Sequence, residues 1–174
     1  MDPLIALIIS CGFAGLFLSA ALKKMLSFSV FKATLEAYQI IPGQILLPTS
    51  ILVILFEFTL CGLWIVEVLR PVAAAGSSIL LVVYAFAIGL NLMRSRSHIS
   101  CGCGWREQPL SWGLVARNTV YILIVLITLL PQTARELYWT DFSLGVLTLT
   151  VAVLINRCAE TLISNSSNIA SWRQ

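Results

Sequence analysis

Two cysteines separated by one glycine are the residues of this chain best suited to chemistry. Cys101 and Cys103 stand in the run Cys-Gly-Cys-Gly, and glycine lets the backbone turn tightly around them. A disulfide between them would close a very small, strained ring, which makes such a bond more oxidising than a structural bridge. The pattern predicts a redox-active dithiol. The alternative is a glycine turn that holds two free thiols.

Positive charge surrounds this pair. Arg94, Arg96 and Arg106 flank the two cysteines, and His98, the only histidine, precedes the first of them by three residues. Cationic neighbours stabilise a thiolate, which is the attacking species in thiol–disulfide exchange. We therefore predict that the two cysteines are the catalytic residues and that His98, Arg94 and Arg96 support them.

The other three cysteines allow two further interpretations. Cys11 and Cys61 fall in apolar runs, where they either pack as small apolar residues or form a second thiol pair. Cys158 would be needed as the fourth ligand if His98 and the Cys-Gly-Cys pair held a structural zinc ion. We predict no metal site and rank a metal-binding protein third among the possible functions.

The composition excludes a soluble globular domain. The mean hydropathy is +0.93, 59% of the residues are hydrophobic and only 11% are charged. A membrane-spanning helix needs about 20 mostly apolar residues, and the chain contains several such runs. We predict an all-α, polytopic transmembrane helix bundle of about five spans, a four-helix core plus one, that forms a single integral membrane domain. The predicted spans cover residues 4–22, 45–66, 72–93, 110–130 and 142–155.

Two segments between the spans have a character of their own. In residues 29–40, Phe31, Leu35 and Tyr38 recur at helical spacing, which predicts an amphipathic helix at the membrane interface. A solvated linker is the alternative. Residues 94–108 are polar and basic and contain the Cys-Gly-Cys motif, so we predict that they form a redox loop at the water boundary.

The distribution of lysine and arginine predicts the orientation. With five spans, nine of the eleven basic residues lie on one side of the membrane, and short basic loops remain cytoplasmic. This places the N-terminus outside, the C-terminus inside and the cysteine pair at the cytoplasmic face. The net charge of +3 indicates no nucleic-acid partner.

Glu57 lies near the middle of the predicted second span. An unpaired carboxylate is costly at that depth, so we expect either a partner or protonation, and either a proton-handling role or an internal polar contact. The candidate partners are Asn91, Arg117 and Asn118 and, only by reaching inward, Lys23 or Lys24.

Taken together, these residues resemble the MauE family of methylamine utilisation proteins, which is itself similar to DoxX-type membrane proteins. The resemblance runs over nearly the whole chain, and its most specific part is the stretch from the cysteine pair to Asn118. The matching residues are Phe31-Lys32, Tyr38 to Pro42, Glu57 with Gly62, Asn91-Leu92 with Arg94, Cys101-Gly102-Cys103, Gln108 to Trp112, and Arg117-Asn118.

The resemblance implies a function in a bacterial cytoplasmic membrane. It implies a role in processing the methylamine dehydrogenase beta (light) subunit, an exported, disulfide-rich protein, beside a thioredoxin-like partner. Cys101 and Cys103 match the motif with evident chemistry, whereas Glu57, Arg117 and Asn118 match positions without an assigned role. The resemblance establishes neither an enzymatic reaction nor a cofactor. A non-redox membrane scaffold or export factor for the same pathway is the alternative function.

One conflict follows from these expectations. The charge pattern places the cysteine pair at the cytoplasmic face, whereas the disulfides of the implied client form outside. Either the orientation is inverted, or electrons cross the membrane through Cys11 and Cys61 or through a bound quinone. The sequence leaves both solutions open.

Overall fold

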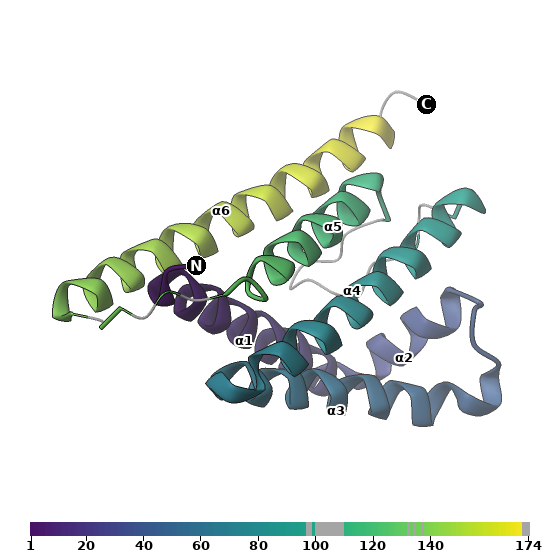
Figure 1. Ribbon diagram of the computed structural model, residues 1–174. Coiled ribbons are helices and arrows are strands. Elements are labelled where there is room, and N and C mark those ends of the chain that lie inside the picture. Colours follow the sequence, from purple (N-terminus) through teal and green to yellow (C-terminus); the bar gives the residue numbers. More distant parts are fainter. Residues whose placement is uncertain (97–98, 100–109, 132, 134, 137, 172–174) are drawn as a thin grey trace.

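The computed structural model describes residues 1–96, 99, 110–131, 133, 135–136 and 138–171, and the regular structure of this part is entirely helical (Figure 1). The predicted all-α polytopic bundle is confirmed. Its helices are α1 (Pro3–Leu26), α2 (Phe28–Ala37), α3 (Leu46–Ile65), α4 (Arg70–Met93), α5 (Trp112–Ile127) and α6 (Trp139–Ser171). Short 3-10 turns at Gly43–Ile45 and Glu67–Leu69 lead into α3 and α4.

Four segments of the described chain are long and apolar enough to cross a membrane. They are Pro3–Leu26, Gly43–Ile65, Glu67–Met93 and Trp139–Asn165. Helix α5 is apolar but has only 16 residues, which corresponds to about 24 Å at the helical rise.

The last two helices differ in length from the predicted spans. The predicted fourth span was 110–130, whereas α5 is shorter at both ends. The predicted fifth span ended at residue 155, whereas α6 continues to Ser171. The prediction ended there because polar residues begin at Asn156. In the structure Asn156 accepts a hydrogen bond from Tyr121 of α5, so a polar residue contributes to helix packing at this point.

Helix α2 corresponds to the segment predicted as an amphipathic helix at 29–40. It has ten residues and follows α1 after Ser27, with Phe31 as its buried residue. The helix is therefore observed, and its position at the membrane interface stays a prediction.

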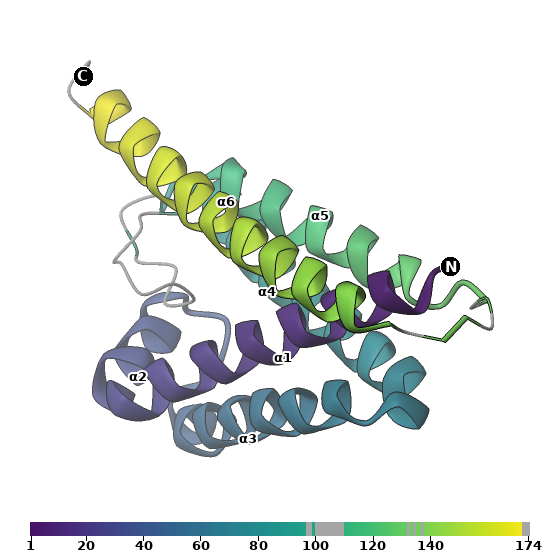
Figure 2. The same cartoon turned by 90° about the vertical axis from the view of Figure 1, so that its left-hand side faces the viewer.

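Successive long helices run in opposite directions. Trp64 and Glu57 of α3 lie beside Ser77 and Tyr84 of α4, respectively, so the two helices are antiparallel. The N-terminus lies at the same end of the bundle as the α5–α6 connection, where the Thr133 amide donates to the Met1 carbonyl at 3.0 Å (Figure 2). Helix α2 lies at the opposite end, together with the C-terminal end of α4. The orientation predicted from the charge pattern requires this alternation of helix direction.

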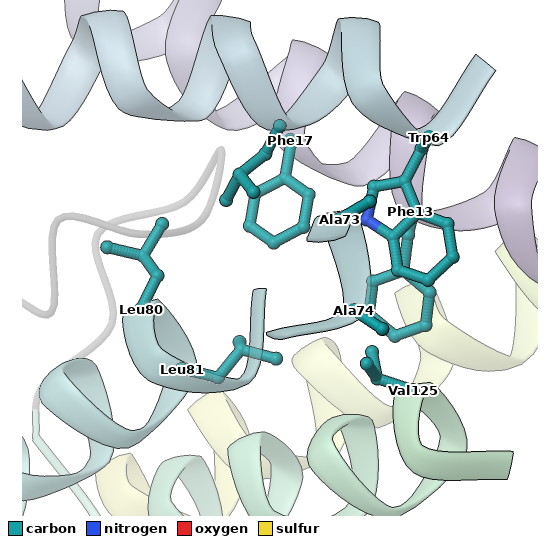
Figure 3. Close-up of a cluster of buried hydrophobic side chains, with 9 residues drawn as sticks. Phe13, Phe17, Trp64, Ala73, Ala74, Leu80, Leu81 and Val125 are labelled. Carbon is teal, nitrogen blue, oxygen red and sulfur yellow. The ribbon is translucent and has the colours of Figure 1, made fainter. Parts of the chain in front are cut away.

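An aromatic core holds α1, α3, α4 and α5 together in the half of the bundle near the N-terminus. Phe13 stacks on Trp64 with ring centroids 5.4 Å apart (Figure 3). Phe13 also meets the ring of Tyr121 edge-on, with centroids 6.0 Å apart. The Trp64 indole N–H donates to the Ser77 hydroxyl at 2.9 Å, which satisfies both buried groups. Polar side chains collect on the other side of this core, toward the α2 end.

Candidate functional site

A buried ion pair lies at the centre of the candidate site. The Lys24 ammonium from the last turn of α1 donates to Oε1 of Glu57 from the middle of α3. Their side chains are 2% and 1% exposed, respectively. The Tyr84 hydroxyl of α4 donates to the same carboxylate oxygen at 2.7 Å and accepts from Lys24 Nζ at 3.2 Å. Three helices therefore share one internal charge pair.

Aromatic rings surround the ammonium group. Lys24 Nζ lies 5.0 Å from the ring centroid of Tyr84 and 5.4 Å from that of Phe31. A cation at this distance from an aromatic ring is attracted by the ring quadrupole. The lysine is thus held by a carboxylate, a hydroxyl and two rings, although it stands in the last turn of a helix long enough to cross a membrane.

Lys24 was one of the predicted partners of Glu57, and the sequence also contains a spacing signal for this arrangement. Seven residues are about two helical turns, so residues at this spacing share a face. The members of this series are Ser10, Phe17 and Lys24 in α1, Ser50, Glu57 and Trp64 in α3, and Ser77, Tyr84 and Asn91 in α4. All are buried except Tyr84, which is partly buried. Polar residues predominate in these seven-residue series, which mark the inward-facing stripe of each helix.

A second polar group joins α5 and α6. Arg117 Nη1 lies 3.5 Å from Glu160 Oε1, and the exposed Arg157 contacts the other oxygen of the same carboxylate at 3.3 Å. Nearby, the Tyr121 hydroxyl donates to Asn156 Oδ1. Arg117 was predicted as a candidate partner of Glu57, and its ion-pair partner is Glu160 instead. Glu160 and Asn156 were both missed because the predicted fifth span ended before them.

A small cavity of about 50 Å³ connects the two polar groups. Glu57, Arg117 and Asn118 all line it, so three residues singled out in the sequence share one internal space. The other lining residues are Leu16, Phe17, Ala20, Lys24, Leu81, Tyr84, Tyr121, Asn156 and Glu160.

Unsatisfied polar atoms border this cavity. Within the described chain, Glu57 Oε2, Arg117 Nε and Asn118 Nδ2 are buried without a hydrogen-bond partner. A bound water needs about 10–15 Å³ and two to four polar partners, so the cavity suits a few water molecules that bridge these atoms. The cavity therefore forms a path lined by polar side chains between Glu57 and Glu160.

A larger cavity of about 270 Å³ lies between α1 and α6 and extends this path outward. It shares Leu16, Ala20, Asn156 and Glu160 with the small cavity and reaches Cys11 and Arg157. Small residues of α1 leave room for this cavity. They are Gly12, Gly15 and Ser19, which line it on the side that faces α6. The buried ion pair is therefore linked by polar side chains to the surface between these two helices.

Most residues of the predicted thiol site lie outside the described part of the chain. Cys101, Cys103 and His98 lie outside the described residues. Arg94 is exposed and Arg96 is half-buried just after α4, where their amides donate to carbonyls of that helix at 3.2 and 3.0 Å. The two arginines therefore stand at the α2 end of the bundle.

The described residues that bracket the cysteine segment are anchored to the bundle. The Leu110 amide donates to the Ile99 carbonyl at 3.1 Å, and both side chains are buried. They pack in one cluster with Tyr38, Ile88 and Leu114. Two points of the chain, eleven residues apart in sequence, are thus fixed together beside α2, α4 and α5.

The three cysteines within the described chain are free thiols. Cys61 is half-buried beside the aromatic core, and Cys11 and Cys158 are exposed. Cys11 and Cys61 therefore do not form the bridge that one interpretation of the sequence allowed. Cys61 packs as an apolar residue.

The two arginines that share Glu160 allow a direct test of the second polar group. Arg117 is 12% exposed and Arg157 is 51% exposed. Replacing Arg117 with methionine should lower the free energy of unfolding by about 1–3 kcal/mol, since it removes a partner from a mostly buried carboxylate. Arg157→Met should cost about 0–1 kcal/mol, as for an exposed pair. Denaturant titration in lipid–detergent micelles measures both. Equal losses of unfolding free energy in the two variants would show that burial of Arg117 adds nothing to the stability of the protein.

Comparison with known proteins adds a second kind of observation. The family model described as "Methylamine utilisation protein MauE" matches residues 2–131. The chain is similar to the methylamine utilization protein MauE of Paracoccus denitrificans, with 29% identity over 166 residues that cover 93% of this chain and 89% of the relative. The protein of the same name from Paracoccus versutus is 30% identical over 165 residues, covering 92% and 88%. That from Methylophilus methylotrophus is 32% identical over 110 residues, covering 63% and 58%. No solved structure matches the chain.

Proposed function

Because this chain belongs to the MauE family of methylamine utilisation proteins, we propose that it exchanges disulfides through Cys101 and Cys103 while the methylamine dehydrogenase light subunit matures. The chain is a helical membrane protein of the methylamine utilisation system. The proposed partner is a thioredoxin-like protein, and the proposed client is the light subunit itself.

The anchoring of Ile99 and Leu110 is the observation that carries this proposal. Both residues are buried at the α2 end of the bundle, and the chain between them contains both cysteines. Cys101 follows Ile99 by two residues, and two residues of extended chain span at most about 7 Å. The anchoring of Ile99 and Leu110 at the α2 end supports the proposal that a soluble partner meets the cysteine pair at that end of the bundle.

The proposed exchange balances as a two-electron reaction. A thiolate of the reduced partner attacks the Cys101–Cys103 disulfide and forms a mixed disulfide, and the second partner thiol then displaces the remaining sulfur. The partner gains a disulfide, and the pair in this chain becomes a dithiol that has taken up two electrons and two protons. Arg94 and Arg96, which stand at the same end of the bundle, favour the thiolate form of nearby cysteines.

The proposed orientation is N-out and C-in in the bacterial cytoplasmic membrane. The helices alternate in direction, so Lys32, Arg94 and Arg96 gather at the α2 end, while Arg70 and Arg135 lie toward the N-terminal end. This distribution supports a cytoplasmic α2 end under the positive-inside rule. In this orientation the proposed exchange also requires that electrons from the exported light subunit cross the membrane.

Single-cysteine variants test the proposed exchange. In Cys101→Ser or Cys103→Ser, the remaining thiolate can still attack the disulfide of the oxidised partner and release one partner thiolate, but this chain has no second thiol to displace the partner from the mixed disulfide, so at least one variant should accumulate that species. Acid quenching, alkylation and non-reducing electrophoresis detect this species, and a reductant should remove it. Cys158→Ser is the matched control because Cys158 is an exposed free thiol.

A non-redox scaffold makes the opposite prediction. If neither single variant traps the partner while the partner still co-purifies with the protein, the exchange reaction is wrong and the scaffold function stands.

A further inference from the structure

A mostly apolar cavity of about 150 Å³ lies between α2, α3 and α4, apart from the two polar cavities. Phe31, Tyr38, Val53 and Ile88 contribute apolar and aromatic walls, and Lys24 and Tyr84 supply polar groups. Every residue that forms this cavity belongs to the described chain. The internal ion pair therefore lies at one side of the cavity, and the rest of the cavity wall is mostly apolar.

The volume limits the ligand to about one ring. An apolar cavity of about 150 Å³ in another protein binds a single benzene molecule. The space is thus too small for a peptide or a whole lipid head group with its sugar or phosphate substituents. A flat six-membered ring fits it.

The polar wall favours a neutral ligand that accepts hydrogen bonds. The charges of Lys24 and Glu57 cancel, and the Tyr84 hydroxyl already donates to Glu57. An ammonium group has three N–H donors, and Glu57 and Tyr84 receive two of them. A carbonyl oxygen suits the remaining donor, whereas an anionic group would be repelled by the adjacent carboxylate.

The cavity opens toward the lipid side of the helices. Val83 is 53% exposed and Ile40 is also exposed, and both line the cavity. A ligand can therefore enter from the membrane and leave an apolar tail outside. A neutral six-membered ring with carbonyl oxygens and an apolar tail is the chemical description of a lipid-soluble quinone.

We infer that this cavity binds the head group of a membrane quinone, with Lys24 donating to one of its carbonyl oxygens. In the setting of the proposed function, on which this role rests, the quinone accepts the electrons of the reduced cysteine pair. Two S–H bonds break and one S–S bond forms, while the quinone gains two electrons and two protons and becomes a quinol. Tyr38 and Ile88 line the cavity and also pack with Ile99, two residues before Cys101 in the sequence, which supports a role for this cavity together with the cysteine pair.

Photo-crosslinking of the full-length protein in lipid nanodiscs tests the binding. The probe is a short-chain azido-benzoquinone, and mass spectrometry maps the labelled residues. We expect labelling of α2, α3 or α4 around the cavity and displacement by decyl-benzoquinone but not by oleate. Absence of labelling, or equal displacement by oleate, would overturn the assignment and indicate a general lipid contact.

Two matched pairs of variants locate the probe. Val83 lines the cavity and its neighbour Val82 does not, and each is 53% exposed, so tryptophan at either position has a similar cost to folding. Val83→Trp should lose labelling, whereas Val82→Trp should keep it. Val53→Trp and its exposed control Leu52→Trp provide a second pair in α3. Equal labelling within both pairs would contradict binding in this cavity.

Quinol formation separates the two proposals. The pre-reduced protein should convert the quinone to quinol, as read from its ultraviolet absorbance, and the Cys101→Ser/Cys103→Ser variant should not. If the quinone binds in the cavity but no quinol forms, its role as electron acceptor is wrong. If no quinone binds while the mixed disulfide with the partner still forms, the cavity assignment fails and the proposed exchange stands.

Discussion

Replacing both Cys101 and Cys103 with serine should abolish maturation of the methylamine dehydrogenase light subunit. A serine hydroxyl cannot form a disulfide, so neither the mixed disulfide nor its resolution can occur. Cells that carry only this variant should contain a light subunit with missing or wrong bridges, which is degraded. Non-reducing electrophoresis after alkylation measures the bridges, and immunoblotting measures the amount of the subunit.

The controls separate loss of chemistry from loss of the protein. The double serine variant should accumulate in the membrane like the wild type, because the described bundle packs through residues outside the cysteine segment. Cys11→Ser and Cys158→Ser change exposed free thiols and should leave the light subunit normal. A correctly bridged light subunit in cells with the double variant would establish the scaffold function instead.

Replacing Lys24 with methionine should cause the largest loss of stability. The change leaves the Glu57 carboxylate buried beside a single hydroxyl donor, Tyr84. Removing one partner from a buried ion pair costs about 3–5 kcal/mol because the remaining charge is uncompensated. Denaturant titration in lipid–detergent micelles measures the free energy of unfolding. Glu67→Gln is the control: Glu67 is 74% exposed in its pair with Arg70, so the loss should be about 0–1 kcal/mol.

The double variant Lys24→Met/Glu57→Leu tells whether the ion pair has a structural or a functional role. Removing both charges replaces the pair by apolar groups of similar size, so stability should return to near the wild-type value. If stability returns while light-subunit maturation stays defective, the pair has a functional role. An unchanged free energy of unfolding in Lys24→Met alone would contradict the internal charge pair.

The membrane architecture was predictable because its signal is local. The first four apolar runs are long enough to identify a span from composition alone, and the helical spacing of Phe31 and Leu35 identified α2. The end of α6 was not predictable in the same way. In the sequence, Asn156 and Glu160 indicate the polar end of a span. In the structure they lie within a longer helix because their side chains pair with Tyr121 and Arg117 of α5.

The candidate site was predictable by residue, and Lys24 was one of several predicted partners of Glu57. Glu57, Arg117 and Asn118 line one cavity, although the sequence placed Arg117 and Asn118 nearer the cytoplasmic edge than Glu57. Which cation meets Glu57 depends on how α1 crosses α3, and that crossing is set by packing of Phe13 on Trp64 far along the chain. The mostly polar series at seven-residue spacing in α1, α3 and α4 would have selected Lys24 among the predicted partners. Their period shows which side chains face inward together.

The redox state of Cys101 and Cys103 in living cells tests the central claim most directly. Rapid acid quenching followed by mass-tagged alkylation counts the free thiols in each molecule. The account predicts two populations, dithiol and disulfide, whose ratio shifts when the thioredoxin-like partner is deleted. A single state, unchanged by that deletion and by growth with or without methylamine, would contradict the account.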